Sequence, residues 1–189
     1  MEKFKLKEAI RGERIVILKR VHEHDKEMWQ AIEESRNLIR EYLPWVDRTK
    51  SVEDVVKATD MFAEYWDNDH EWGFCLYSIP EHQFLGCIGV HLINFQSRSA
   101  EIGYWLRVSE QGKGYMTEAV KLVEEELFKN GIHRIVISCD INNRNSGNVA
   151  KRAGYQLESI AKEALYHPTG LHDKEIYVKF SPYPIKDWD

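Results

Sequence analysis

The 189-residue sequence has little of several features, and each shortage excludes a class of protein. No apolar run approaches the roughly 20 residues that a membrane-spanning helix needs, and residues 1–7 are charged where a signal peptide would be apolar. The net charge is −5, whereas a general nucleic-acid binder needs a basic surface. We therefore expect a cytoplasmic protein that contacts neither membrane nor nucleic acid, with a basic protein or a cationic amine as its partner.

Cysteine and metal-ligand patterns are also scarce. The three cysteines, Cys75, Cys87 and Cys139, lie in apolar segments without ligand spacing, which predicts reduced, buried thiols. The eight histidines show no H-x-x-x-H or comparable ligand set, so no metal site is expected. Four of them are assigned to loops: His22, His24, His167 and His172.

The length allows one hydrophobic core and is short for two, so we expect a single domain over 1–189. An antiparallel meander followed by a strand–helix–strand unit predicts an α+β fold: a mixed, mostly antiparallel sheet with helices on both faces, in three layers. Hydrophobic periodicity gives the elements. The expected strands are 14–20, 72–79, 84–95, 100–108, 132–141, 155–166 and 176–180, and the expected helices are 25–43, 51–68, 114–131 and 146–153.

A glycine-rich turn between a strand and a helix carries the strongest functional signal. Gly112 and Gly114 allow positive φ and close approach of the backbone. Several N–H groups at the start of a helix then point toward one place, which suits a phosphate. A turn of this kind is at least as often a packing device, and this one has the spacing of neither a P-loop nor a dinucleotide-binding turn.

Three stretches of sequence together point to a family: 100–106, 111–119, and 143–146 followed by 153–155. In order and spacing they resemble the GNAT acetyltransferase superfamily, and within it the RimJ/RimL-type ribosomal-protein N-acetyltransferases. The resemblance implies the GNAT fold, acetyl-CoA as cofactor, and transfer of the acetyl group to an amine, first of all the N-terminus of a ribosomal or other basic protein. A homodimer is compatible with it.

The resemblance also implies which residues hold the cofactor. The N–H groups of 112–116 and the Thr117 hydroxyl would hold the pyrophosphate, and Met116 fits if its side chain turns away. The strand from Trp105 to Val108 would splay from its neighbour and bind the pantetheine arm through its backbone. The full cofactor set is Trp105, Leu106, Val108, Gln111, Gly112, Lys113, Gly114, Tyr115, Met116, Thr117, Asn143 and Ser146.

The implied catalytic residues each have a structural alternative. By resemblance, Asn143 binds the pantetheine end and Ser146 assists the departing thiolate, yet both residues are also ordinary helix caps. Glu101 is the first candidate for the general base, and a carboxylate on a solvated strand face is an equal alternative. A glutamate proposed as the base in ribosomal-protein relatives falls at Leu165, which puts that role in doubt; Glu163, two residues before, is the second candidate.

Aromatic residues mark the expected acceptor side. Tyr42 and Trp45 are the substrate-binding candidates, in a group with Pro44, Trp66 and Trp72 that is otherwise explained as core. Two other functions remain open: acetylation of a small amine such as a polyamine or an antibiotic, and binding of acyl-CoA without turnover. Thiol release with and without peptides separates catalysis from binding.

Overall fold

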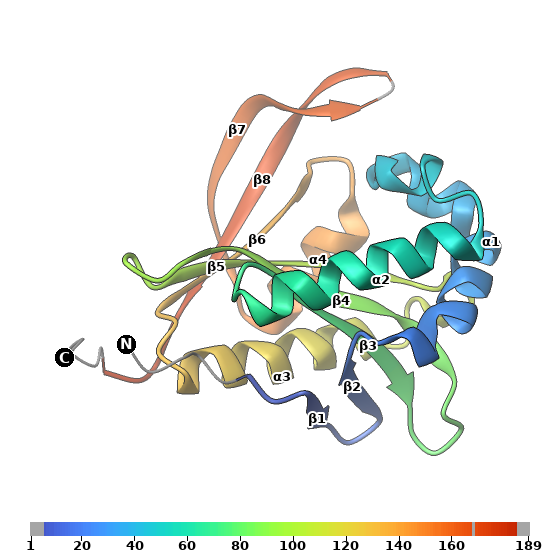
Figure 1. Ribbon diagram of the computed structural model, residues 1–189. Helices are drawn as coiled ribbons and strands as arrows, with labels where there is room; N and C mark the ends of the chain where they lie inside the picture. The colour runs from blue at the N-terminus through green and yellow to red at the C-terminus, as the bar shows by residue number, and fades with distance from the viewer. Residues whose placement is uncertain (1–5, 168, 185–189) are drawn as a thin grey trace.

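The computed structural model describes residues 6–167 and 169–184, and its strands form one sheet in the order β1-β2-β3-β4-β5-β6-β8-β7 (Figure 1). Only the β5–β6 pair is parallel, which confirms the expected mixed, mostly antiparallel sheet. The strands are β1 Ala9–Arg11, β2 Ile15–Lys19, β3 Trp72–Ser78, β4 Phe84–Asn94, β5 Ser99–Leu106, β6 Arg134–Asp140, β7 Gln156–His167 and β8 Gly170–Phe180. The helices are α1 Asp25–Tyr42, α2 Val52–Asp67, α3 Tyr115–Lys129 and α4 Arg144–Ala153, with 3-10 turns η1 His22–His24, η2 Pro44–Asp47 and η3 Val108–Glu110.

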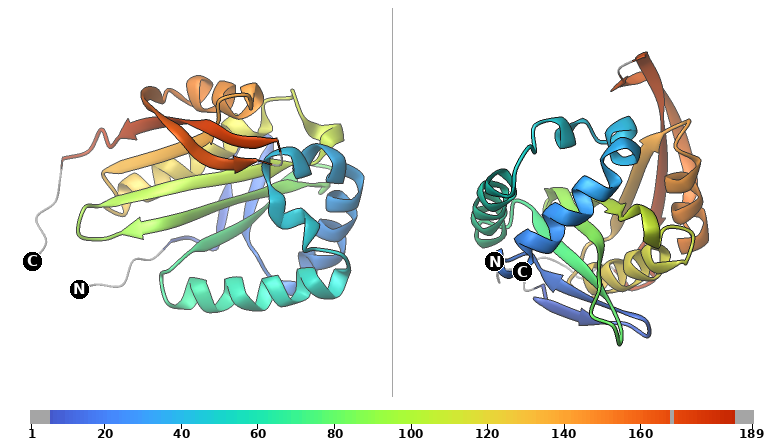
Figure 2. Two further views of the ribbon diagram at one scale, coloured as in Figure 1. Left: turned by 90° about the horizontal axis from the view of Figure 1, so that it is seen from above. Right: turned by 90° about the vertical axis from the view of Figure 1, so that its right-hand side faces the viewer.

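Helices cover both faces of the sheet, as expected. The right-hand view of Figure 2 separates α1 and α2 on one side from α3 and α4 on the other. The larger apolar cluster lies on the α3/α4 side and contains Ala119, Val123 and Leu127 of α3. The smaller cluster lies under α1 and η2 and includes Ile32 and Val46. Residues alternate in direction along each strand, so β2, β3, β4 and β5 contribute to both clusters.

The largest differences from the predicted strands are at β1 and β8. The short strand β1 was not expected, and β8 begins at Gly170, six residues before the predicted start at 176. The added segment of β8 reads Leu171-His172-Asp173-Lys174-Glu175, which lacks the apolar alternation that identifies a half-buried strand. It extends because it pairs along β7, and the resulting hairpin projects from the body of the molecule (Figure 1).

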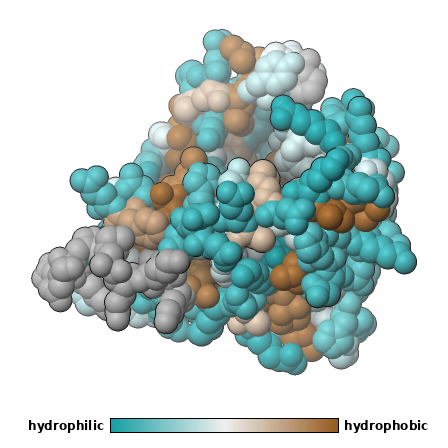
Figure 3. All heavy atoms as spheres, viewed as in Figure 1, coloured by the Kyte–Doolittle hydropathy of each residue, from teal (hydrophilic) through white to brown (hydrophobic). Residues whose placement is uncertain are grey.

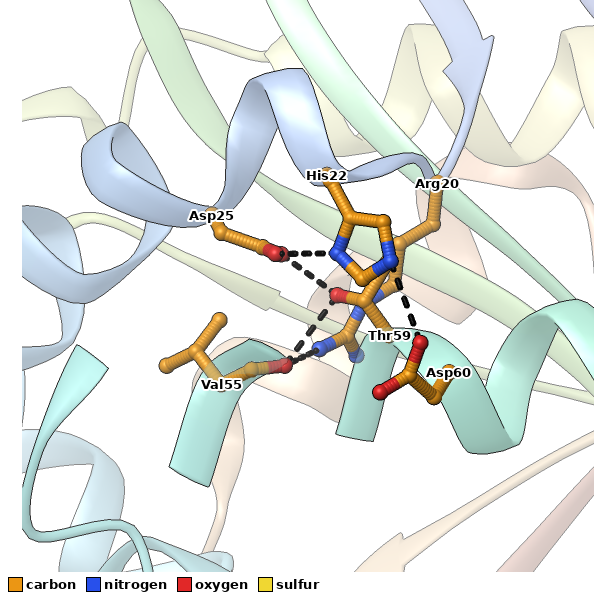
Figure 4. Close-up of polar contacts among 6 residues, drawn as sticks. All are labelled: Arg20, His22, Asp25, Val55, Thr59 and Asp60. Atoms are coloured by element: carbon orange, nitrogen blue, oxygen red, sulfur yellow. Dashed lines mark hydrogen bonds and ion pairs between the residues drawn. The ribbon is translucent and has the colours of Figure 1, made fainter. Parts of the chain in front are cut away.

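The assignment of four histidines to loops was wrong. His22 and His24 form the 3-10 turn η1, His167 ends β7, and His172 lies within β8. His22 takes part in a polar network that ties α1 and α2 to the end of β2 (Figure 4).

The network centres on the buried Thr59 of α2. Its hydroxyl lies 2.5 Å from Oδ1 of Asp25, while Arg20 donates from Nε to the same hydroxyl at 2.9 Å and from a terminal nitrogen to the carbonyl of Val55 at 3.1 Å (Figure 4). His22 bridges the carboxylates of Asp25 and Asp60 at 2.8 and 3.1 Å. Since buried polar groups need partners, these contacts fix how the two helices sit on the sheet.

Some expectations concern absences. Within 6–167 and 169–184, no helix combines the length and apolar character needed to cross a membrane. The same described residues contain no group of three or more His, Cys, Asp or Glu side chains arranged to hold a metal ion. Most of the N-terminal stretch 1–7, on which the expectation about a signal peptide depends, lies outside the described residues.

Candidate active site

Strands β5 and β6 diverge at the centre of the sheet. They pair in parallel only over residues 99–101 and 134–136, whereas β5 stays paired with β4 as far as Leu106. Residues 102–106 therefore have a neighbouring strand on one side and none on the other. Apart from the Leu106 carbonyl, which accepts from the Gln111 side chain, backbone groups on the open side of β5 have no strand partner and can bind an extended ligand, as the expected splay requires. The strand itself ends at Leu106 rather than at the predicted residue 108.

The glycine-rich turn follows this open strand and leads into α3. Gly112 and Gly114 adopt φ of 77° and 85°, the left-handed region that favours glycine. In the described part of the chain, the N–H groups of 112–117 have no backbone or side-chain acceptor, and the first helical bond runs from Glu118 N–H to the Gly114 carbonyl at 3.2 Å. Consecutive free N–H groups at a helix N-terminus form an anion-binding site.

Two side chains of the first helical turn fit this use of the loop. The side chain of Met116 is 3% exposed and packs into the larger apolar cluster, so it turns away from the N–H groups as required. The Thr117 hydroxyl is buried and has no hydrogen-bond partner among the described residues. A buried hydroxyl without a partner is costly, and its place in this turn suits a phosphate oxygen.

A brace that the sequence did not predict holds the loop against β2. The Glu118 carboxylate accepts from the backbone N–H groups of Glu13 and Arg14, both at 2.9 Å. Arg14 donates from Nε to the same carboxylate and from a terminal nitrogen to the Lys113 carbonyl, each at 2.9 Å. A Cβ on Gly12 would lie 2.6 Å from Oε1 of Glu118, so the close approach requires glycine.

The start of α4 lies beside the open side of β5. Asn143 is the N-cap, since its side chain accepts from the Ser146 N–H at 3.1 Å. Ser146 is therefore not a cap, because its hydroxyl donates instead to the Tyr104 hydroxyl at 3.2 Å. Burial raises the pKa of Tyr104, so this phenol stays protonated and can donate to the Ser146 carbonyl at 3.1 Å.

Glu101 occupies the point where β5 and β6 separate. It faces the α1/α2 side, opposite in direction to Ala100 and Ile102, and its side chain is 16% exposed. Its carboxylate accepts from the Ser138 hydroxyl and lies 3.8 Å from Nε2 of His91. Burial works to raise the pKa of Glu101, but His91, the Ser138 hydroxyl and the charge of Lys174 together outweigh it and hold the pKa below its ordinary value. The Glu101 carboxylate is therefore mostly enclosed and does not lie on a solvated strand face.

The aromatic residues do not gather into one group. Trp72 is 1% exposed within the larger core, and Trp66 packs on Phe74 with ring centroids 5.1 Å apart. Trp45 is 37% exposed, and its ring lies 6.2 Å from that of Trp105 on the α1/α2 side of β5. Of the five, therefore, Trp45 lies near the diverging strands, and Tyr42 reaches the loop after β6 with its hydroxyl 3.4 Å from the Asn142 carbonyl.

Comparison with known proteins decides the family. The model of the acetyltransferase (GNAT) domain matches residues 16–156, most of the chain. The chain belongs to the GNAT acetyltransferase family.

Two relatives of this GNAT chain are named as acetyltransferases of ribosomal proteins. It is 28% identical over 157 residues to the ribosomal-protein-serine acetyltransferase of Escherichia coli strain K12, covering 82% of this chain and 87% of the relative. It is 24% identical over 148 residues to the [ribosomal protein uS5]-alanine N-acetyltransferase of the same strain, with 75% and 76% covered.

Solved structures share the fold. The ribosomal L7/L12 α-N-protein acetyltransferase RimL in complex with coenzyme A aligns with a TM-score of 0.87 at 23% identity, over 92% of this chain and 98% of that one. The microcin C7 self-immunity acetyltransferase MccE in complex with acetyl-CoA and AMP aligns with a TM-score of 0.85 at 24% identity, over 89% and 93%. The GNAT fold expected from the resemblance is thus confirmed.

Three of the remaining cofactor candidates already use their polar groups in contacts within the chain. The Val108 N–H is already bound by the Ser35 hydroxyl at 2.9 Å, and Val108 lies in η3 rather than in the strand. The side-chain amide of Gln111 donates to the Leu106 carbonyl at 3.3 Å. The Lys113 ammonium pairs with the buried Glu110 at 2.9 Å. These contacts shape the loop, and they leave the N–H groups of 112–117 as its free donors.

The second base candidate, Glu163, lies apart from the enclosed carboxylate of Glu101. It is exposed in a bulge of β7, with φ of 48°, and its N–H donates to Asp173 of β8 at 3.1 Å. Figure 3 shows polar and apolar surface mixed along this hairpin. The exposed apolar side chains of the two strands are Leu157, Ile160, Tyr166, Leu171 and Phe180.

Proposed function

We propose that this GNAT protein transfers the acetyl group of acetyl-CoA to the N-terminal α-amine of a protein, with a ribosomal or other basic protein as the acceptor. The observation that carries the proposal is the row of free N–H groups at 112–117, placed directly after a strand that is open along one side. The first feature suits the pyrophosphate of coenzyme A and the second suits its extended pantetheine arm.

The residues at the diverging strands suit direct attack in a ternary complex. Acetyl-CoA supplies an acyl thioester, which is already activated toward an amine. An α-amine has a pKa of about 7.7–8.0, against about 10.4 for lysine, so it needs only a modest base. Ser146, with its hydroxyl on Tyr104, is the proposed aid to the leaving thiolate, and Asn143 contributes both the helix cap and a neighbouring amide.

Two carboxylates on the proposed acceptor side suit a cation. Glu101 and Asp140 project toward the α1/α2 side, and the net charge of the chain is −5. Both features favour an ammonium or a basic peptide. Names of relatives that modify ribosomal proteins at serine and alanine support a protein N-terminus as the acceptor. Tyr42 and Trp45 are the proposed substrate contacts.

The proposal is tested by thiol release from acetyl-CoA against basic peptides that begin with serine, alanine or methionine, with spermidine and an aminoglycoside beside them. Turnover confined to one peptide class supports it and names the acceptor. Turnover with the small amines alone contradicts it in favour of a small-molecule acetyltransferase. Tight binding of coenzyme A without turnover on any acceptor contradicts catalysis.

Two further parts of the proposal stand on the resemblance. A cytoplasmic location follows if the acceptor is a ribosomal protein. The homodimer stays a prediction, which sedimentation equilibrium of the purified chain tests.

A further inference from the structure

A second polar cluster lies on the acceptor-side face of the sheet. Nδ1 of His172 on β8 is 2.5 Å from Oδ2 of Asp140 at the end of β6, and the two side chains are 19% and 6% exposed. Nε2 of His172 is 2.9 Å from the hydroxyl of Thr169, which is an exposed residue in the turn before β8. The cluster therefore runs from a buried carboxylate, through an imidazole, to a hydroxyl at the surface.

Asp140 fixes which nitrogen of His172 can accept a proton. Oδ1 of Asp140 accepts from the Asn142 N–H at 2.8 Å, and its Oδ2 faces His172. An ionised carboxylate only accepts hydrogen bonds, so Nδ1 of His172 must carry a hydrogen. In the neutral ring Nε2 then has a free lone pair, which is the arrangement of a general base held by a carboxylate.

The Thr169 hydroxyl can serve both protonation states of His172. When the ring is neutral, the hydroxyl donates to Nε2. When the ring is protonated, Nε2 donates to the hydroxyl oxygen, and the hydroxyl hydrogen turns to Nδ1 of His167 at 2.7 Å. That nitrogen also accepts from the Thr169 N–H at 3.2 Å, so it is free of hydrogen. The one hydroxyl hydrogen serves either Nε2 of His172 or Nδ1 of His167, so the hydroxyl turns as a proton passes through Thr169.

A few residues of the chain, from Asp140 to Ser146, connect this cluster to the site at the start of α4. Asp140 holds the Asn142 N–H, the next residue Asn143 caps α4, and Ser146 follows on that cap. Tyr42, the proposed substrate contact, donates to the Asn142 carbonyl and its ring lies 6.4 Å from that of His167. An amine bound beside Tyr42 would therefore meet the turn that carries Thr169.

We propose that His172, positioned by Asp140, is the proton acceptor for the incoming amine, with the Thr169 hydroxyl as the relay. The inference rests on the proposed function. One N–H bond of the acceptor ammonium breaks, and its proton passes to the Thr169 oxygen as the Thr169 hydrogen passes to Nε2 of His172. The nitrogen keeps the electron pair with which it attacks the thioester. Glu101, whose carboxylate accepts from Ser138 and whose pKa is held below its ordinary value, is not assigned this role.

The charged and titratable neighbours set the expected pH dependence. They are Asp140 on β6, Asp173 on β8, the stacked His167 ring at 4.2 Å, and Tyr42 on α1. Burial raises the pKa of Tyr42 to about 12, so this phenol does not titrate near neutrality. The acid limb of activity is therefore not assigned to Tyr42.

The test compares pH profiles of kcat/KM for the best peptide acceptor in the wild-type protein, His172→Gln and Asp140→Asn. Asp140→Asn keeps an oxygen for the Asn142 N–H but places an amide donor against Nδ1, which moves the ring hydrogen to Nε2. Both variants should lose tenfold or more at pH 7, where only about a tenth of an α-amine is neutral. The loss should shrink toward pH 9.5, where the amine is already neutral.

Further readouts separate proton transfer from a structural role. Exogenous imidazole should partly restore His172→Ala, Thr169→Ser should keep activity where Thr169→Val loses it, and coenzyme A affinity by calorimetry should be unchanged throughout. Glu158→Gln, at the other end of the same hairpin, where Glu158 pairs with Arg134, is the control with a wild-type profile. Superimposable profiles of an active wild-type protein and His172→Gln would overturn the inference. A wild-type protein that acetylates nothing would instead overturn the proposed function.

Discussion

Arg14 and Glu118 lie far apart in sequence, yet the Arg14 Nε is 2.9 Å from Oε2 of Glu118, and this contact joins the start of β2 to the first turn of α3. The same carboxylate holds two backbone N–H groups, so its removal leaves several donors without an acceptor. Arg14 also holds the Lys113 carbonyl and lies 5.1 Å from the Tyr115 ring. The brace thus positions the loop that carries the free N–H groups.

Glu118→Ala is therefore expected to lower both stability and coenzyme A affinity. The lost hydrogen bonds should reduce the free energy of unfolding by about 1–3 kcal/mol, measured by urea denaturation, and calorimetry should show weaker binding. Glu125→Ala is the control on the same helix, where Glu125 pairs with Lys129 at the surface. Unchanged coenzyme A affinity in Glu118→Ala would show that the brace does not shape the site.

Gly114→Asp is expected to abolish coenzyme A binding, because it places a carboxylate among N–H groups that would face phosphate. Gly131 offers a control, since it too has a positive φ, 96°; a Cβ there would have no atom within 4 Å, whereas a Cβ at Gly114 would lie 3.4 Å from the Arg14 guanidinium. Gly131→Asp should carry a similar backbone strain and leave affinity unchanged. Equal affinity of the two variants by calorimetry would contradict the assignment of the loop.

Ser146→Ala is expected to lower kcat more than it raises KM, because the hydroxyl would meet charge mainly in the transition state. Its thermal stability should stay close to that of the wild-type protein, since Asn143 and not Ser146 caps α4. Asn143→Ala should instead lose about 1 kcal/mol of stability. Steady-state kinetics beside thermal unfolding distinguishes the two residues, and parallel losses of stability and activity in Ser146→Ala would argue for a purely structural serine.

His22 should make the docking of α1 and α2 dependent on pH. A hydrogen bond to Asp25 raises the pKa of His22 above its ordinary value of 6.5, although the ring is exposed. Because the folded-state pKa is the higher one, the stabilisation is fully present below the unfolded pKa and is lost as pH rises through the folded value. His22→Gln should flatten this dependence in thermal melts between pH 5 and 8.5. A wild-type slope in the variant would mean that other groups cause it.

The sequence predicted those parts of the protein that depend on local patterns. Alternation and helical periodicity located α1 to α4 and the central strands, and Gly112 and Gly114 do adopt the positive φ that two glycines in a turn indicate. The family followed from the order of three short stretches, and the match to the GNAT domain confirms it. Such features are encoded within a few neighbouring residues, so no tertiary contact is needed to find them.

Features that depend on tertiary contact escaped prediction. Arg14 and Glu118 are far apart in the sequence, and nothing in the sequence except their opposite charges indicates that they pair. His172 was assigned to a loop because the first half of β8 lacks an apolar face, so its contact with Asp140 could not be foreseen. Ser146 has the residue type of a cap, and only the geometry shows that Asn143 takes that place. The Ser146 hydroxyl instead donates to the Tyr104 hydroxyl.

The central claim is acetyl transfer from acetyl-CoA to a protein α-amine through the 112–117 loop. Mass spectrometry of a serine-, alanine- or methionine-starting basic peptide, incubated with acetyl-CoA and the wild-type protein, Gly114→Asp or Gly131→Asp, tests it most directly. The account predicts one acetyl group on the α-amine with the wild-type protein and Gly131→Asp, and none with Gly114→Asp. Acetylation that survives Gly114→Asp, or acetyl groups found only on lysine side chains, would contradict it.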